Sequence, residues 1–143
     1  STITRLQNMG TPDYLISAAC QLVLAQRLAR RTCKDCRIPD DDVNPKVLQD
    51  LGFSAEQASR AKAFKGKGCP KCKDTGYKGR QGIYEILVVS KPLKEAILRQ
   101  ATTPELREIA VKEGFQTMQD MGRRLISSGD LNFREYERVL ISE

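Results

Sequence analysis

The chain has 143 residues, a formal net charge of +6, 40% hydrophobic residues and no histidine. This length and composition suffice for one hydrophobic core with a smaller appended module. No run of 18 or more apolar residues occurs, so no membrane-spanning helix is expected. The first residues also lack the charged and apolar regions of a signal peptide, and they lack an initiator Met. We therefore expect the chain to be part of a longer protein.

The first thirty residues are predicted to be helical. Ile3, Leu6 and Met9 recur at helical spacing. A second helix is expected over residues 12–31, because Pro12 follows a capping threonine and suits the first helical position. Apolar side chains surround the middle of this second helix, so we expect it to be buried, with Cys20 as a core thiol.

Two Cys-x-x-Cys pairs follow, Cys33 with Cys36 and Cys69 with Cys72. Two thiolates at this spacing can bind one tetrahedral metal ion, and two such pairs complete a four-sulfur shell. A closed shell without a free position predicts a structural zinc site. A disulfide framework is an alternative that the lack of a secretory context disfavours. A rubredoxin-like iron site is another, disfavoured because Arg37 and Lys73 occupy positions where rubredoxins usually have glycine.

The residues between the two pairs are predicted to form an insertion with two short helices. The first starts at Asn44-Pro45, and the second starts at Ser54, which forms a capping box with Gln57. A metal ion bound at the ends of this insertion would close a long loop whose closure otherwise costs chain entropy.

After the second pair, residues 83–89 are predicted to form the one clear strand, buried on both faces because its apolar residues are nearly continuous. The remaining residues are predicted to form four short helices that pack as a compact bundle. These helices are expected over residues 90–100, 103–114, 117–129 and 132–141. Asn132 and Glu135 form a capping box at the start of the last helix.

Basic residues are concentrated in one stretch of the sequence. Between Arg60 and Arg80 there are eight Lys or Arg residues and one acid, Asp74. Nucleic acid, phospholipid headgroups and acidic protein surfaces are the partners such a stretch suits, and a simply solvated face is the alternative. A zinc-ribbon nucleic-acid-binding module is therefore our second hypothesis. Only Phe64 and Tyr77 are aromatic here, which is few for base stacking.

Four features in order resemble a known family. Residues 1–10 read STITRLQNMG, residues 26–31 read QRLARR, the four-cysteine module follows directly, and residues 76–85 read GYKGRQGIYE. Together they resemble the secretion ATPases of the GspE/PilB type, which power type II secretion and type IV pilus extension. The resemblance covers essentially the whole chain, and the pilus-extension branch is the more similar.

The resemblance implies a hexameric, RecA-like motor at the cytoplasmic face of the inner membrane, where it acts on a platform membrane protein. This chain would be the C-terminal part of that motor. The implied fold class is mainly α with a short β element. Residues 1–32 would be the C-terminal helices of the RecA-like ATPase core, residues 33–82 the tetracysteine zinc-binding insertion, and residues 83–143 a strand followed by a C-terminal helical subdomain.

The full-length motor would bind ATP and Mg²⁺, but this chain contains no P-loop sequence and no strand that ends in acidic residues. We therefore expect no catalytic residue in the chain, no ATP hydrolysis by it alone and no nucleic-acid partner. By resemblance, Arg5 and Arg80 match family arginines that act near the nucleotide or across the subunit interface. The alternative for both is a surface salt bridge.

Overall fold

A computed structural model describes residues 2–141, which divide into two compact units. Unit 1 comprises residues 2–25 and 85–117, and unit 2 comprises residues 26–84 and 118–141. About 48% of the described residues are helical and 21% lie in strands, which confirms a mainly α chain. The β part is larger than the single short element that we predicted. None of the described helices is both long enough and apolar enough to cross a membrane.

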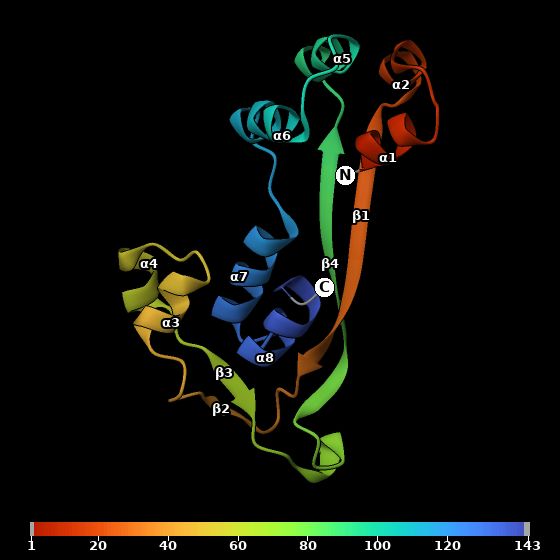
Figure 1. Cartoon of the computed structure of the whole chain (residues 1–143). Coiled ribbons are helices and arrows are strands. Elements are labelled where there is room, and N and C mark those ends of the chain that lie inside the picture. Colours follow the sequence, from red (N-terminus) through yellow and green to blue (C-terminus); the bar gives the residue numbers. More distant parts are fainter. Residues whose placement is uncertain (1, 142–143) are drawn as a thin grey trace. The chain divides into compact units, whose positions relative to one another are not determined.

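Figure 1 shows the helices of unit 1. They are α1 (Thr2–Asn8), α2 (Asp13–Ala19), α5 (Lys91–Leu98) and α6 (Thr103–Lys112). Their apolar faces share one core, which includes Ile3, Ile16, Leu93, Ile97 and Leu106. The Ser17 hydroxyl donates to the backbone carbonyl of Lys94 at 3.1 Å, which ties α2 to α5. The helical spacing predicted for residues 3–9 is thus confirmed, although Met9 itself is exposed.

Unit 2 holds the four paired cysteines and a second core. Figure 1 shows its helices and strands. Its elements are β2 (Arg37–Pro39), α3 (Pro45–Asp50), α4 (Ala55–Arg60), β3 (Phe64–Gly66), the 3₁₀ turn η1 (Pro70–Cys72), α7 (Met118–Ser128), α8 (Phe133–Tyr136) and the π-helical turn η2 (Glu137–Ile141). Asn44 caps α3, and Ser54 and Gln57 form the predicted capping box of α4. Both predicted helices of the insertion are confirmed.

The predicted helix over residues 12–31 is wrong beyond Ala19. Residues Leu22–Thr32 form β1, which pairs with β4 (Tyr77–Val88) in a two-stranded sheet. Leu, Ala, Gln and Arg favour helices locally, but pairing with a distant strand overrides that preference. The expected burial is wrong as well, because Leu22 and Leu24 are each 56% exposed. Cys20 is the half-buried C-cap of α2 rather than a residue within a buried helix.

Strand β4 begins six residues earlier than predicted and is not buried on both faces. Every second side chain from Tyr84 onward, namely Tyr84, Ile86 and Val88, is exposed. The side chain of Ile83, by contrast, is fully buried. The four C-terminal helices exist, but the single bundle is not confirmed: α5 and α6 belong to unit 1, and α7 and α8 to unit 2. A bundle was predicted because short helices in succession usually pack together, whereas here α5 and α6 share their core with α1 and α2.

Candidate metal centre

The four paired cysteines meet in unit 2 because a short antiparallel sheet joins the two ends of the insertion. Strands β2 and β3 pair with Arg37 opposite Gly66. Cys36 directly precedes β2, and Cys69 and Cys72 begin and end the turn of η1 just after β3. The backbone N–H of Cys33 donates to the carbonyl of Gly76 at 2.9 Å. The β2–β3 pairing and this backbone bond therefore bring the two cysteine pairs together.

The sulfur atoms form a compact cluster. All four lie within 4.8 Å of one another. The separations are 3.8 Å between Cys33 and Cys69, 3.8 Å between Cys36 and Cys72, and 3.7 Å between Cys69 and Cys72. A tetrahedral ion with Zn–S bonds of about 2.3 Å separates neighbouring sulfurs by about 3.8 Å. The side chains thus already have the spacing that such an ion requires.

Backbone N–H groups point at the sulfurs. Gly68 donates to the Cys36 sulfur at 3.3 Å, and Cys69 and Gly76 donate to the Cys72 sulfur at 3.2 and 3.3 Å. Burial raises the pKa of the Cys72 thiol, but these two donors, together with hydrogen bonds from the Cys69 and Cys36 side chains, outweigh it and bring the pKa to about 6. Burial and the neighbouring sulfurs raise the pKa of Cys36 to about 12. Four adjacent thiols resist ionising together unless a cation balances their charge.

Two glycines allow the backbone to close around the cluster. A Cβ atom at Gly66 would lie 2.1 Å from the carbonyl oxygen of Gly76, and a Cβ at Gly76 would lie 2.6 Å from the carbonyl oxygen of Gly66. Gly76 also has a φ of +80°, which favours glycine. No larger residue fits at either position without moving the backbone that surrounds the sulfurs.

Exposed cations lie close to the four cysteines in the sequence. Lys34, Lys67, Lys71 and Lys73 are all exposed, and Lys71 pairs with Asp35 at 3.5 Å. A divalent ion with four thiolates carries a net charge of about −2, and nearby cations stabilise thiolates. The surroundings therefore suit a metal thiolate centre.

The geometry excludes one of the three chemistries that the sequence left open. Separations of 3.7–3.8 Å exceed the disulfide bond length of about 2.05 Å, and all five cysteines are free. The disulfide alternative is therefore wrong. Zinc and iron both take tetrahedral sulfur shells, so the cluster fits either ion.

Next to the cluster lies an ion pair network around a buried carboxylate, which the sequence analysis missed. Glu135 was predicted to cap its own helix, and Asn132 does accept from the Glu135 N–H at 2.8 Å. The Glu135 carboxylate, however, binds the guanidinium groups of Arg30 and Arg138 instead of returning to Asn132. The predicted capping box is half formed. Arg30 lies far from Glu135 in the sequence, so no local sequence pattern indicated that the two would pair.

A family model for type II/IV secretion system proteins matches residues 1–138. The chain belongs to this family. PilB, a type IV pilus assembly ATPase of Thermus thermophilus, is 42% identical over 120 residues, which are 84% of this chain and 13% of that protein. PilB of Myxococcus xanthus is 35% identical over 134 residues (94% and 24%). The type II secretion system protein HxcR of Pseudomonas aeruginosa is 33% identical over 139 residues (97% and 25%). The chain thus spans a quarter or less of the length of these relatives.

The two arginines assigned by resemblance to secretion ATPases lie in different units. Arg5 lies on α1 of unit 1 and Arg80 on β4 of unit 2, and both side chains are exposed. Within residues 2–141, neither takes part in an ion pair. A nucleotide role for them stays a prediction.

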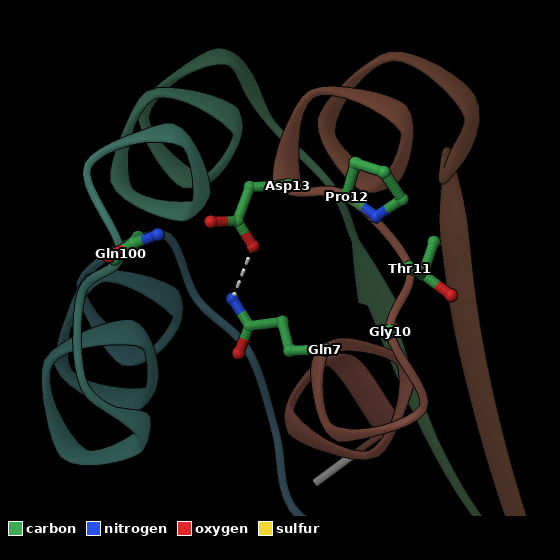
Figure 2. Close-up of a pocket in the computed structure, with 6 residues that line it drawn as sticks. All are labelled: Gln7, Gly10, Thr11, Pro12, Asp13 and Gln100. Atoms are coloured by element: carbon green, nitrogen blue, oxygen red, sulfur yellow. Dashed lines mark hydrogen bonds between the residues drawn. The ribbon is translucent and has the colours of Figure 1, made fainter.

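Unit 1 also contains an open pocket of about 530 Å³. It is lined by Gln7, Gly10, Thr11, Pro12, Asp13 and Gln100 (Figure 2). The amide nitrogen of Gln7 donates to the Asp13 carboxylate at 2.9 Å, so the only carboxylate of the lining already has a partner. This pocket offers one carboxylate and no cysteine, which makes the cysteine cluster the stronger candidate site.

Proposed function

We propose that this chain is the C-terminal, zinc-bearing part of a secretion ATPase that powers type IV pilus extension or type II secretion. The observation that carries the proposal is the cluster of four sulfurs, all within 4.8 Å of one another, in a chain of this family. Cys33, Cys36, Cys69 and Cys72 would hold the ion. When bound, it supplies structural cross-linking rather than reaction chemistry, because four thiolates leave no open position.

The rest of the proposal concerns the longer motor. We propose that it is a hexamer, that it works at the cytoplasmic face of the inner membrane, and that it acts on a platform membrane protein. The names of relatives from both the pilus and the secretion branch support a transport motor in general. The pilus branch is the one that we favour. In the motor, residues 1–32 would complete a RecA-like core, residues 33–82 would form the metal module and residues 83–143 a C-terminal subdomain.

Nucleotide chemistry is assigned to the parts of the motor outside this chain. ATP and Mg²⁺ need a phosphate-binding P-loop and a metal-binding carboxylate, and no P-loop sequence occurs in these 143 residues. Arg5 and Arg80 are proposed to contribute positive charge near the nucleotide or across a subunit interface. An arginine held there stabilises charge that develops during phosphoryl transfer.

Nucleic-acid binding by a zinc ribbon is the second candidate, favoured by the exposed basic residues between Arg60 and Arg80. Two contacts count against it, because both aromatic rings in this stretch are engaged. The Arg37 guanidinium lies 5.1 Å from the centre of the Phe64 ring, and that of Arg30 lies 4.1 Å from the centre of the Tyr77 ring. Neither ring is free on both faces for base stacking. Binding to mixed nucleic acid that weakens steeply with added salt would favour this second candidate.

Elemental analysis of the purified chain, with thiol titration before and after chelation, tests the metal assignment. We expect about one zinc per chain, and four thiols that become reactive only when the ion is removed. Cys20 serves as an internal reference, because its reactivity is expected to be the same in both states. Iron in place of zinc would point to electron transfer, and the oxidised protein would then be red. No metal and fully reactive thiols would reject the proposed centre.

A further inference from the structure

The buried carboxylate of Glu135 is fully hydrogen bonded. Its side chain has no exposed surface, and Oε1 accepts from Arg30 Nη2 at 2.7 Å, Arg30 Nε at 3.0 Å and Arg138 Nε at 2.7 Å. Oε2 accepts from Arg138 Nη2 at 2.8 Å and from the backbone N–H of Arg30 at 2.7 Å. The bond to the backbone matters most here, because it fixes the path of β1 itself and not only a side chain.

Tyr77 closes the same network from the other strand. The Arg30 guanidinium lies 4.1 Å from the centre of the Tyr77 ring, a cation–π contact. Asn132 donates from its amide nitrogen to the Tyr77 hydroxyl at 2.9 Å and accepts from the Glu135 N–H at 2.8 Å. The four residues Arg30, Tyr77, Asn132 and Glu135 therefore form a closed ring of contacts between β1, β4 and the start of α8.

This ring lies next to the sulfur cluster on both strands. On β1, Arg30 is three residues before Cys33. On β4, Tyr77 follows Gly76 directly, and Gly76 donates to the Cys72 sulfur while accepting from the Cys33 N–H. The carbonyl of Asp130, just before α8, accepts from the Thr32 N–H at 3.0 Å. The backbone that presents Cys33 and the backbone that faces Cys72 are thus both attached to the segment that begins α8.

We infer that Glu135 and Tyr77 are positioning residues for the metal centre, so that docking of α8 increases the affinity of the cysteines for the ion. This inference rests on the proposed metal binding. Binding and docking are linked reciprocally, so the bound ion must stabilise the docked α8 to the same extent. Partners that orient the ligands of a metal without touching it are known to change affinity by 10–100-fold. A buried ion pair that only contributes to folding would show no such link.

Competition of a chromophoric chelator with the chain for Zn²⁺ tests the inference. We expect Glu135→Gln to raise the zinc dissociation constant about tenfold, because it removes the charge that holds both arginines. Glu137→Gln is the matched control, since Glu137 lies two residues further along, is exposed and loses the same charge; we expect it to change the constant less than twofold. Tyr77→Phe keeps the ring but loses the bond to Asn132, and we expect about a fivefold weakening.

Amide hydrogen exchange provides a second readout. In the unmodified chain, removing zinc should speed exchange across residues 133–141 more than across α6, which belongs to unit 1. In Glu135→Gln the same removal should change exchange across residues 133–141 much less, because the link is already broken. Equal responses in the two proteins would overturn the inference.

The outcomes separate the two proposals. If the unmodified chain binds no zinc, the proposed metal centre fails. If it binds zinc and both Glu135→Gln and Tyr77→Phe match the Glu137→Gln control, the centre stands and the positioning inference is overturned. If Glu135→Gln does not fold, as judged by circular dichroism, the Tyr77→Phe affinity decides.

Discussion

The guanidinium of Arg30 and the carboxylate of Glu135, 105 residues apart in the sequence, are bound at 2.7 Å with the carboxylate completely buried. Burial would raise the pKa of Glu135, but the hydrogen bonds from Arg138 and Arg30 outweigh it and lower the pKa from 4.5 to about 2. The folded chain thus binds this proton less readily than the unfolded chain does.

Stability should therefore depend on this one carboxylate at acidic pH. The group stabilises the fold fully above pH 4.5, and this contribution is lost as the pH falls toward 2. The shift corresponds to a loss of free energy of unfolding on the order of 3 kcal/mol. Chemical denaturation at several pH values, in the presence of chelator so that metal release does not contribute, should show a flatter acid limb for Glu135→Gln. The Glu137→Gln control should retain the slope of the unmodified chain, and identical slopes in all three would contradict the assigned pKa.

The cysteines should divide into two classes. Cys72→Ser should abolish stoichiometric zinc, because a three-sulfur site loses the closed shell. Cys20→Ser should keep it, because Cys20 lies in unit 1 as the C-cap of α2. Metal content of the two variants, purified side by side, is the measurement. Loss of zinc from both would mean that Cys20 matters to the centre, and retention by both would mean that Cys72 does not bind the ion.

Because Gly76 is closely packed, its replacement by alanine should be far more destabilising than the same replacement at Gly79. Both have a φ of +80°, but a Cβ at Gly79 meets no atom within 4 Å, whereas at Gly76 it meets the Gly66 backbone at 2.6 Å. Gly79→Ala should cost about 1 kcal/mol for the left-handed conformation alone. Gly76→Ala should cost clearly more and also weaken zinc binding. Thermal unfolding with and without zinc measures both effects; equal costs would show that the backbone around the cluster can shift.

The purified chain should not hydrolyse ATP. Its 143 residues contain no phosphate-binding loop, and without one the γ-phosphate is neither held nor aligned. Phosphate release should equal the buffer background with Mg²⁺ present, both with and without zinc. Turnover that is clearly above background and that follows the protein through gel filtration would reject the proposal that ATP hydrolysis needs parts of the motor outside this chain.

Arg5 and Arg80 should matter for turnover in the longer motor and little for folding. Each is exposed and has no ion pair among residues 2–141, so replacement by Ala should change unfolding by less than about 0.5 kcal/mol. ATP turnover should fall at least tenfold if either arginine stabilises phosphoryl transfer. Lys78→Ala, an exposed neighbour on β4, is the control for Arg80. If turnover and stability fell together, both arginines would have a structural role and not a role in phosphoryl transfer.

Signals confined to a few neighbouring residues were enough to predict several features. Ser54 with Gln57, and Asn44 before Pro45, marked the starts of α4 and α3, because a cap needs only a side chain and the N–H groups that follow it. The two Cys-x-x-Cys pairs indicated the four residues that the structure brings together. The family was also evident from four short motifs in order, and the match over residues 1–138 confirms it.

What only the tertiary structure decided depends on distant partners. Residues Leu22–Thr32 have the composition of a helix, but they form β1 because β4, about fifty residues away, supplies its hydrogen bonds. Glu135 has the local position of a capping residue, but its carboxylate binds Arg30 because folding buries that carboxylate beside the half-exposed guanidinium. Local spacing in the sequence was enough to indicate the paired cysteines and the starts of helices. Strand pairing and buried charge pairs depend on which segments meet, and that is settled only when the chain folds.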